Sequence, residues 1–370
     1  MKLLMTADTI GGVWTYALEL SRALRPLGTE IVLATMGRPL SAAQRADVRT
    51  LPHVSVSEST FRLEWMQDSW HDVDLAGDWL LRLEDAERPD VVHLNGYTHG
   101  ALPWMAPVVM VGHSCVRSWW EAVRGDAVPD EWSEYTRRAG EGLGAADAVV
   151  APSHAMLGAL VRHYGPLLHA SVIPNGRDAA LFPPAEKESF IVAAGRVWDE
   201  AKNLRALDEV APELPWPVYV AGDDTAPTGE RHKLRAARRL GVLNRAELAH
   251  WFGRASIYAF PARYEPFGLS VLEAALAGCA LVLGDLPSLR ELWGAVATFV
   301  EPNDRGQLAC ALGRLCEDDA LRRAQAARAR RHAMLFGPER MAEKYQALYT
   351  HVRSARAGTT SDRERLACAS

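Results

Sequence analysis

The sequence predicts an α/β protein made of two Rossmann-like domains, and three observations lead to that prediction. Short apolar, β-rich runs alternate with helical patterns, which is typical of βαβ units and parallel sheets. Runs such as DVVHLN (90–95) are almost continuously apolar, as a sheet covered on both faces requires. A polar, aperiodic segment containing Pro183-Pro184 separates two series of such runs. We therefore expect two lobes, with a ligand cleft between the carboxyl ends of two parallel sheets.

The first series of elements fills the N-terminal half. Its predicted strands are 2–6, 30–36, 54–57, 90–95, 108–113, 148–153 and 171–175. Helical patterns lie between most of them, at 13–25, 73–86, 130–144 and 154–163. Residues 1–175 are therefore assigned to an N-terminal Rossmann-like domain.

The second series follows a linker at 175–189. Its predicted strands are 190–196, 218–223, 257–262, 280–285 and 298–302, and its predicted helices are 201–211, 230–240, 245–254, 269–277, 304–316 and 320–334. Residues 176–337 are assigned to a C-terminal Rossmann-like domain. An amphipathic helix is expected at 338–356, and residues 357–370 are expected to form a disordered tail.

The composition excludes several classes of protein. The net charge is −5, with 48% hydrophobic and 24% charged residues, and no basic face stands out, so no nucleic-acid partner is indicated. No apolar run reaches the roughly 18 residues of a transmembrane segment, and the N-terminus lacks the features of a signal peptide. The five cysteines form no C-x-x-C pair, which argues against a disulfide framework or zinc ribbon and favours a cytoplasmic location.

The segment 258–285 carries the strongest chemical signal. A strand runs into a loop that holds Glu265 and Gly268, and a helix follows from about Leu269. We expect the amides of Phe267, Gly268 and Leu269 to be free at this helix N-terminus, where they would form an anion site.

Glu273 lies one turn into the same helix, among apolar residues. A carboxylate buried there without partners would cost several kcal/mol, and as an acceptor it could hold the two vicinal hydroxyls of a ribose. The alternative is that neither glutamate binds a ligand: Glu265 would be a solvated residue at the start of the helix, and Glu273 would lie on a polar seam.

A glycine loop at Gly11-Gly12 joins strand 2–6 to helix 13–25, and paired glycines permit a tight turn that brings amides close to a phosphate or sugar. It is not a G-x-G-x-x-G motif, and no acidic residue follows the second strand, so a dinucleotide site is disfavoured. Trp14, Trp119 and Trp120 are candidates for acceptor binding because indole faces stack on sugars. Core packing is the alternative for each.

A D-x-D pattern at Asp72-Val73-Asp74 suggests metal binding at first sight. It opens a predicted helix rather than ending a strand, and aspartate is favoured at a helix start by capping and by the helix dipole. No metal site is predicted.

These elements together resemble glycosyltransferase family four, the retaining nucleotide-sugar glycosyltransferases of GT-B fold, through about residue 350. Glu265 and Glu273 match its Glu–seven residues–Glu motif. The remaining matches are GGVWTYALELSRAL to its glycine loop and first helix, DVVHLN to its fourth strand, GHS (112–114) to its loop ending in a histidine, PSHAM and IPNG to its interdomain passage, and AAGRVWDEAKN (193–203) to its Gly-Arg…Lys element.

The resemblance implies a GT-B arrangement: two Rossmann-like domains facing each other across a cleft, the acceptor in the first and the donor in the second. It also implies that helix 338–356 packs back on the first domain. Arg196 and Lys202 would neutralise the diphosphate leaving group without a metal, although surface solvation is the alternative for such a pair. His113 would bind the donor sugar. Here it is followed by Ser114 where the family often has Asp, and Lys202 is followed by Asn203 where the family has Gly.

The predicted function is metal-independent, retaining transfer of a sugar from a nucleoside-diphosphate sugar, with UDP favoured, to a hydroxyl of a glycan or small molecule. No cofactor is expected. The predicted catalytic residues are His113, Arg196, Lys202 and Glu265; the donor-binding residues are Gly11, Gly12, Arg196, Lys202, Phe267, Gly268, Leu269 and Glu273. Two alternatives remain: another GT-B enzyme such as a nucleotide-sugar epimerase, and a non-catalytic nucleotide-sugar-binding partner subunit.

Overall fold

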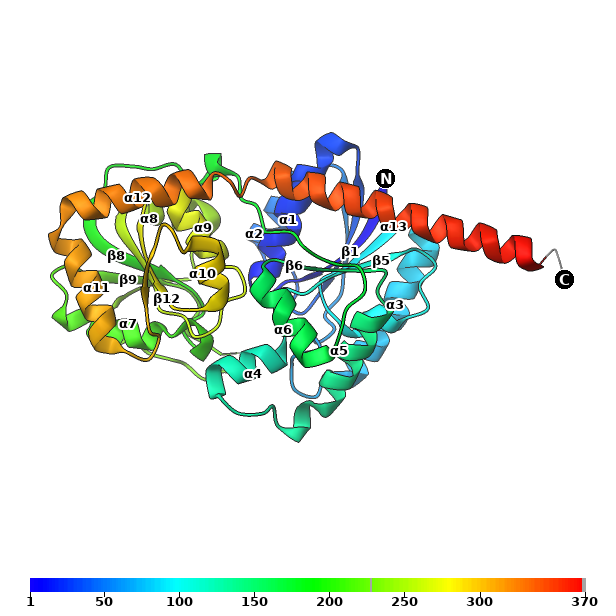
Figure 1. The fold of residues 1–370 in the computed structure, drawn as a ribbon, viewed down its shortest axis with the longest axis horizontal. Helices are drawn as coiled ribbons and strands as arrows, with labels where there is room; N and C mark the ends of the chain where they lie inside the picture. The colour runs from blue at the N-terminus through cyan, green and yellow to red at the C-terminus, as the bar shows by residue number, and fades with distance from the viewer. Residues whose placement is uncertain (227, 368–370) are drawn as a thin grey trace. The chain divides into compact units, whose positions relative to one another are not determined.

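The computed structural model of the chain describes residues 1–226 and 228–367 (Figure 1). The chain forms two compact units. The first comprises Met1–Ser118, Ala127–Gly176 and the segment from Pro338 onwards, and the second comprises Trp119–Asp126 and Arg177–Gly337. The division at Gly176 and Arg177 falls at the start of the segment that the sequence marks as a linker.

The first unit is built on a seven-stranded parallel sheet of order β3-β2-β1-β4-β5-β6-β7. Its strands are β1 (Lys2–Asp8), β2 (Glu30–Met36), β3 (Val54–Glu58), β4 (Val91–Leu94), β5 (Val108–Val111), β6 (Ala148–Ala151) and β7 (Ala170–Val172). The strand order reverses between β1 and β4, and ligands of such sheets bind at the carboxyl ends of the strands beside this switch point.

Helices cover both faces of this sheet. Helix α1 (Gly12–Leu24) and helix α13 (Pro338–Ala367) lie side by side on one face, where Tyr16, Tyr345 and Tyr349 are completely buried (Figure 1). Helices α3 (Trp70–Glu87), α5 (Ser133–Ala145) and α6 (His154–Tyr164) pack on the other face. The remaining helices are α2 (Ala42–Arg49) and α4 (Val116–Arg124), and α4 straddles the division between the two units.

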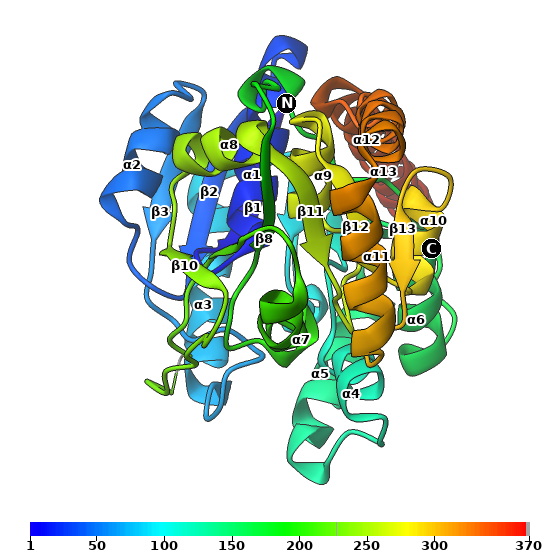
Figure 2. The same cartoon turned by 90° about the vertical axis from the view of Figure 1, so that its left-hand side faces the viewer.

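The second unit is built on a six-stranded parallel sheet of order β10-β9-β8-β11-β12-β13 (Figure 2). Its strands are β8 (Glu188–Ala194), β9 (Val218–Ala221), β10 (Arg238–Gly241), β11 (Ala255–Phe260), β12 (Ala280–Gly284) and β13 (Thr298–Val300). The order reverses between β8 and β11, so the switch point of this sheet lies at their carboxyl ends.

Helices cover this sheet on both faces as well. Helices α7 (Leu204–Val210) and α11 (Arg305–Glu317) pack on one face. The other face packs against α8 (Arg245–Arg254), α9 (Leu269–Leu276), α10 (Pro287–Trp293) and α12 (Asp319–Ala333). The fold class predicted from the sequence, an α/β protein with two Rossmann-like parallel sheets, is confirmed.

Two expectations about local structure are wrong. Residues 230–240 were expected to form a helix, but they form irregular chain leading into strand β10. Buried Asp208 accepts hydrogen bonds from the backbone N–H groups of Arg235, Ala236 and Ala237, and these bonds replace the helical pattern.

The disordered tail expected at 357–370 is replaced by helix as far as Ala367, because the segment after Gly358 contains no further helix breaker and ends in good helix formers. Cys368 and the rest of that tail lie outside the described residues.

Candidate functional site

The glycine loop lies at the carboxyl end of β1. Gly11 caps helix α1 with φ of 103°, a backbone conformation that glycine adopts readily, and both Gly11 and Gly12 are exposed. The Asp8 carboxylate accepts the Ile10 N–H at 2.6 Å, which bends the chain into the loop. Trp14 packs into the core of the first unit, with 6% of its surface exposed.

His113 follows β5 on the same edge of the first sheet. Its Nε2 atom is 2.8 Å from Oδ1 of Asn95, which follows β4, and its ring meets the ring of Tyr16 edge-on at a centroid distance of 4.5 Å. Burial lowers the pKa of His113 to about 3, so the imidazole is neutral at physiological pH. The sequence analysis did not identify Asn95 or Tyr16 as neighbours of His113.

Arg196 and Lys202 lie at the switch point of the second sheet, just beyond β8. The guanidinium Nη2 of Arg196 is 2.6 Å from Oδ2 of Asp199, which also caps the short helix η5 (Glu200–Lys202). Burial alone would raise the pKa of Asp199, but the positive charges of Arg196 and Lys202 hold it below its usual range. Asp199 was not singled out from the sequence, although it lies within the quoted AAGRVWDEAKN element.

Glu265 connects the loop after β11 to this cluster. Its Oε2 atom is 2.9 Å from Lys202 Nζ, and its Oε1 atom accepts the backbone N–H groups of Phe267 at 3.2 Å and Gly268 at 2.9 Å. The expectation that these amides are free is therefore wrong for Phe267 and Gly268, because the carboxylate of the preceding loop caps them. Gly268 has φ of 87° and directly precedes α9, which starts at Leu269.

Glu273 is buried in α9 and forms an ion pair with Arg177. The Nη2 and Oε1 atoms are 2.7 Å apart, and the two side chains are only 3% and 8% exposed. The Arg177 guanidinium also lies over the ring of Phe182, 5.0 Å from its centroid. Sequence reasoning missed Arg177 because it stands in the segment regarded as a linker. The sequence did hold one indication of such a residue: a carboxylate buried in an apolar helix, that of Glu273, requires a charged partner.

Trp119 and Trp120 belong by their contacts to the second unit rather than to the first. Their rings are 5.9 Å apart between centroids, and the Arg124 guanidinium lies close to both rings. The Trp119 Nε1–H donates to Oδ1 of Asp199 at 3.5 Å. The sequence analysis had assigned both tryptophans to the first domain, whereas their contacts are with the second unit.

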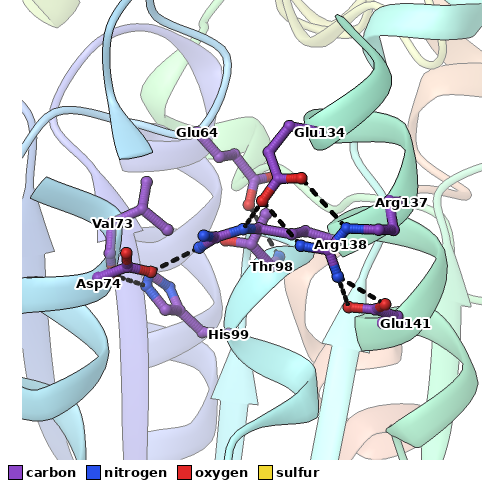
Figure 3. A network of polar contacts seen from close by, with 9 residues as sticks. All are labelled: Glu64, Val73, Asp74, Thr98, His99, Glu134, Arg137, Arg138 and Glu141. Atoms are coloured by element: carbon purple, nitrogen blue, oxygen red, sulfur yellow. Dashed lines mark hydrogen bonds and ion pairs between the residues drawn. The ribbon is translucent and has the colours of Figure 1, made fainter. Parts of the chain in front are cut away.

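The two carboxylates of the D-x-D pattern have separate partners in the first unit. Asp72 accepts the backbone N–H of Arg62 at 2.9 Å. Oδ1 of Asp74 is 2.5 Å from Nη1 of Arg138 (Figure 3). Arg138 also contacts Glu134 of its own helix at 2.6 Å. Both aspartates therefore have structural contacts that explain their presence at the start of α3.

No helix in the described part of the chain combines the length and apolar character needed to cross a bilayer.

Both halves of the chain match known protein families. Residues 10–181 match the family described as Glycosyltransferase Family 4, and residues 188–318 match Glycosyl transferases group 1. The D-inositol 3-phosphate glycosyltransferase of Xylanimonas cellulosilytica is 29% identical, over 94% of this chain and 93% of that protein. A glycogen synthase of Mycobacterium tuberculosis is also 29% identical, over 87% of this chain and 86% of that protein.

Solved structures of similar fold include sucrose-phosphate synthase from Thermosynechococcus elongatus, with a TM-score of 0.81 and 17% identity over 96% of this chain and 100% of that one. Anabaena HepE, solved in complex with UDP and glucose, has a TM-score of 0.75 and 16% identity over 95% of this chain and 100% of that one. These likenesses establish the GT-B fold.

Proposed function

The chain belongs to the glycosyltransferases, with a first half of the family 4 type, and from that premise we propose that it transfers a sugar from a nucleoside-diphosphate sugar to an acceptor hydroxyl, with retention of configuration and without a metal ion. The observation that carries the proposal is the pairing of Arg196 and Lys202 with acids at the switch point of the second sheet. Ligands of open α/β sheets bind at such points.

The charges of this cluster suit a diphosphate leaving group. Arg196 and Lys202 are each held by one carboxylate, from Asp199 and Glu265, so the four side chains are together close to neutral. A diphosphate that entered would compete with those carboxylates for the two cations. Negative charge grows on the diphosphate as the bond to the sugar breaks, and preorganised cations stabilise this change more than they stabilise the ground state.

In the proposed reaction the acceptor oxygen attacks C1 of the sugar on the face from which the diphosphate leaves. The C1–O bond to the diphosphate breaks, the bond from the acceptor oxygen to C1 forms, and the acceptor proton passes to the departing phosphate oxygen. Arg196 and Lys202 bind the diphosphate, Glu273 accepts from the ribose hydroxyls, and His113 contacts the sugar. Glu265 is proposed to bind the sugar, because its carboxylate is fixed by two backbone amides.

UDP is the proposed nucleotide. HepE, which shares the fold, has been solved with UDP-glucose, and this supports a uridine nucleotide without identifying the sugar used here. Relatives of similar identity are named for different acceptors, an inositol phosphate in one case and glycogen in another, so the proposal leaves the acceptor as a hydroxyl of a glycan or small molecule.

Thermal unfolding with nucleotides tests the donor site. In EDTA, UDP at 100 times its dissociation constant should stabilise the protein by about 2.7 kcal/mol, or raise its melting temperature by roughly 5–10 °C. Lys202→Ala should lose most of this shift. Arg205→Ala is the matched control, since Arg205 is a nearby cation whose side chain is 86% exposed. Equal shifts in both variants, or a shift that requires Mn²⁺, would contradict the proposed site.

A further inference from the structure

A chain of hydrogen bonds runs from His113 to the C-terminal helix α13 within the first unit. Oδ1 of Asn95 lies 2.8 Å from Nε2 of His113 and 3.3 Å from Nε2 of His93. The other ring nitrogen of His93, Nδ1, is 2.7 Å from the hydroxyl of Tyr349 on α13. His93 and Tyr349 are completely inaccessible, so this chain lies in the core beneath the carboxyl ends of β4 and β5.

The orientation of the Asn95 amide follows from its other contacts. Its Nδ2 donates to the backbone carbonyl of Thr6 at 2.6 Å, and its backbone N–H donates to Thr6 Oγ1 at 2.9 Å. A carbonyl oxygen only accepts, so the amide nitrogen must face Thr6 and the amide oxygen must face the two histidines.

This orientation determines where each histidine carries its proton. Oδ1 of Asn95 only accepts, so Nε2 of His113 must donate, and in a neutral ring Nδ1 is then the acceptor. For the same reason the proton of His93 lies on Nε2, so the Tyr16 hydroxyl oxygen, 3.4 Å from Nε2, can only accept from it. Nδ1 of His93 is then left to accept from the Tyr349 hydroxyl. The two lone pairs of Oδ1 are sufficient for both donors.

Ring packing fixes the plane of His113 as well. The Tyr16 ring contacts it edge-on, with a centroid distance of 4.5 Å and an interplanar angle of 68°. Tyr16 itself is 1% exposed, so it has little freedom to move aside.

We propose that Asn95 is a positioning residue: it holds His113 as the Nε2–H tautomer, so that Nδ1 accepts a hydrogen bond from a hydroxyl of the transferred sugar. His93 and Tyr349 complete the chain and keep the Asn95 oxygen in place. The part that concerns the sugar rests on the proposed function. It follows that the site selects a sugar with a hydrogen-bond donor at this position, and that a methyl ether or fluoro analogue there is a poor donor substrate.

The tautomer is measured directly by two-dimensional ¹H–¹⁵N spectra of the histidine rings, on protein without ligand. The His113 signals are assigned by their loss in His113→Gln. We expect a protonated Nε2 and an unprotonated Nδ1 in the wild type. A protonated Nδ1, or a fast mixture of tautomers, would overturn the proposal. Because no donor is present, this result is independent of the proposed function.

A double-mutant cycle separates positioning from a general structural role. Asn95→Ala should lower kcat/KM for donor hydrolysis about tenfold, the loss expected for one hydrogen bond. If Asn95 acts through His113, the double variant Asn95→Ala/His113→Gln should be within about threefold of His113→Gln alone. Losses that multiply would refute the coupling. Wild-type protein that hydrolyses no nucleotide sugar would refute the proposed function while the ring spectra still decide the tautomer.

A second pair of variants covers the case in which Asn95→Ala does not fold. Tyr349→Phe removes only the hydroxyl that donates to His93, and should shift the Nδ1 resonance of His93. Tyr345→Phe, which removes a buried hydroxyl one turn away on the same helix, is the control and should shift it much less. Equal shifts in the two variants would contradict the bond between Tyr349 and His93.

Discussion

Glu273→Gln should destabilise the second unit strongly, because it leaves the Arg177 charge buried without the carboxylate that accepts from it. The Arg177–Glu273 pair is 2.7 Å apart, with side chains 3% and 8% exposed. Removing one partner of such a pair costs about 3–5 kcal/mol, since the remaining buried charge loses its counter-charge. For a unit of this size that corresponds to a fall of roughly 6–20 °C in melting temperature.

The assay is the unfolding of four proteins, by heat in a calorimeter and by urea. The wild type and Glu273→Gln give the cost of breaking the pair. The double variant Arg177→Met/Glu273→Gln removes both charges and should recover most of the loss, because a buried pair replaced by apolar groups is often close to neutral. The matched control is Glu209→Gln, whose partners Arg205 and Arg305 are 86% and 65% exposed, and it should cost less than about 1 kcal/mol.

A Glu273→Gln variant as stable as the wild type would refute the reasoning. It would mean that the pair contributes nothing to folding and that Glu273 is held there for its ligand alone. If the reasoning holds, the ligand role of Glu273 must be measured as the UDP affinity of the double variant against that of the wild type, because only these two proteins are expected to be of similar stability.

Three further predictions follow from particular contacts. Lys202→Ala should lower turnover roughly 10- to 150-fold, the equivalent of one charge-assisted hydrogen bond, and steady-state kinetics in EDTA test this. Its melting temperature should change little, because the carboxylate of Glu265, the partner of Lys202, keeps two amide donors. Gly222→Ala should prevent folding, because its Cβ would lie 1.8 Å from the carbonyl oxygen of Gly195. Gly229 has φ of 88° but open space around it, so Gly229→Ala should lower the free energy of unfolding by only about 1–2 kcal/mol, as thermal unfolding curves of the two variants would show. Burial and the nearby His113 lower the pKa of His93 to about 3. Its contribution to the free energy of unfolding is therefore complete above its unfolded pKa of about 6.5 and is lost as the pH falls toward the folded pKa. Between pH 7 and pH 5 the free energy of unfolding, measured in urea, should fall by about 2 kcal/mol more in the wild type than in His93→Gln.

The sheets were predictable because their signal is local. Apolar runs such as DVVHLN are buried on both faces, and each predicted strand has a counterpart within a few residues in the structure. Helices α2 and α4 were missed where few side chains are buried: no residue of α2 is buried, and α4 buries only Ser118. Helix α10 was missed as well, although it buries Leu289, Leu292 and Trp293, because seven residues are too few to show a helical period. The failed helix at 230–240 shows the opposite limit, because good helix formers there are overruled by a distant carboxylate, that of Asp208.

The sequence indicated which residues to consider for the candidate site, but it did not indicate which of them form pairs. The sequence indicates Arg196, Lys202 and Glu265 through their positions at strand ends, where a sheet of this kind binds ligands. It does not indicate that Arg177 reaches Glu273, which lies 96 positions further along the chain, or that Asn95 contacts His113. Such pairings depend on how neighbouring loops are placed by the sheet, and no local pattern encodes them.

The most direct test of the central claim, metal-independent transfer with retention, is the configuration of the sugar first released from UDP-glucose. Proton NMR follows the hydrolysis in EDTA from the first minutes, before the two anomers of free glucose equilibrate. Retention predicts that the α-anomer appears first, with UDP in equal amount, at a rate that Lys202→Ala lowers. If the β-anomer appears first, or if glucose is released only after a divalent metal is added, the account is contradicted.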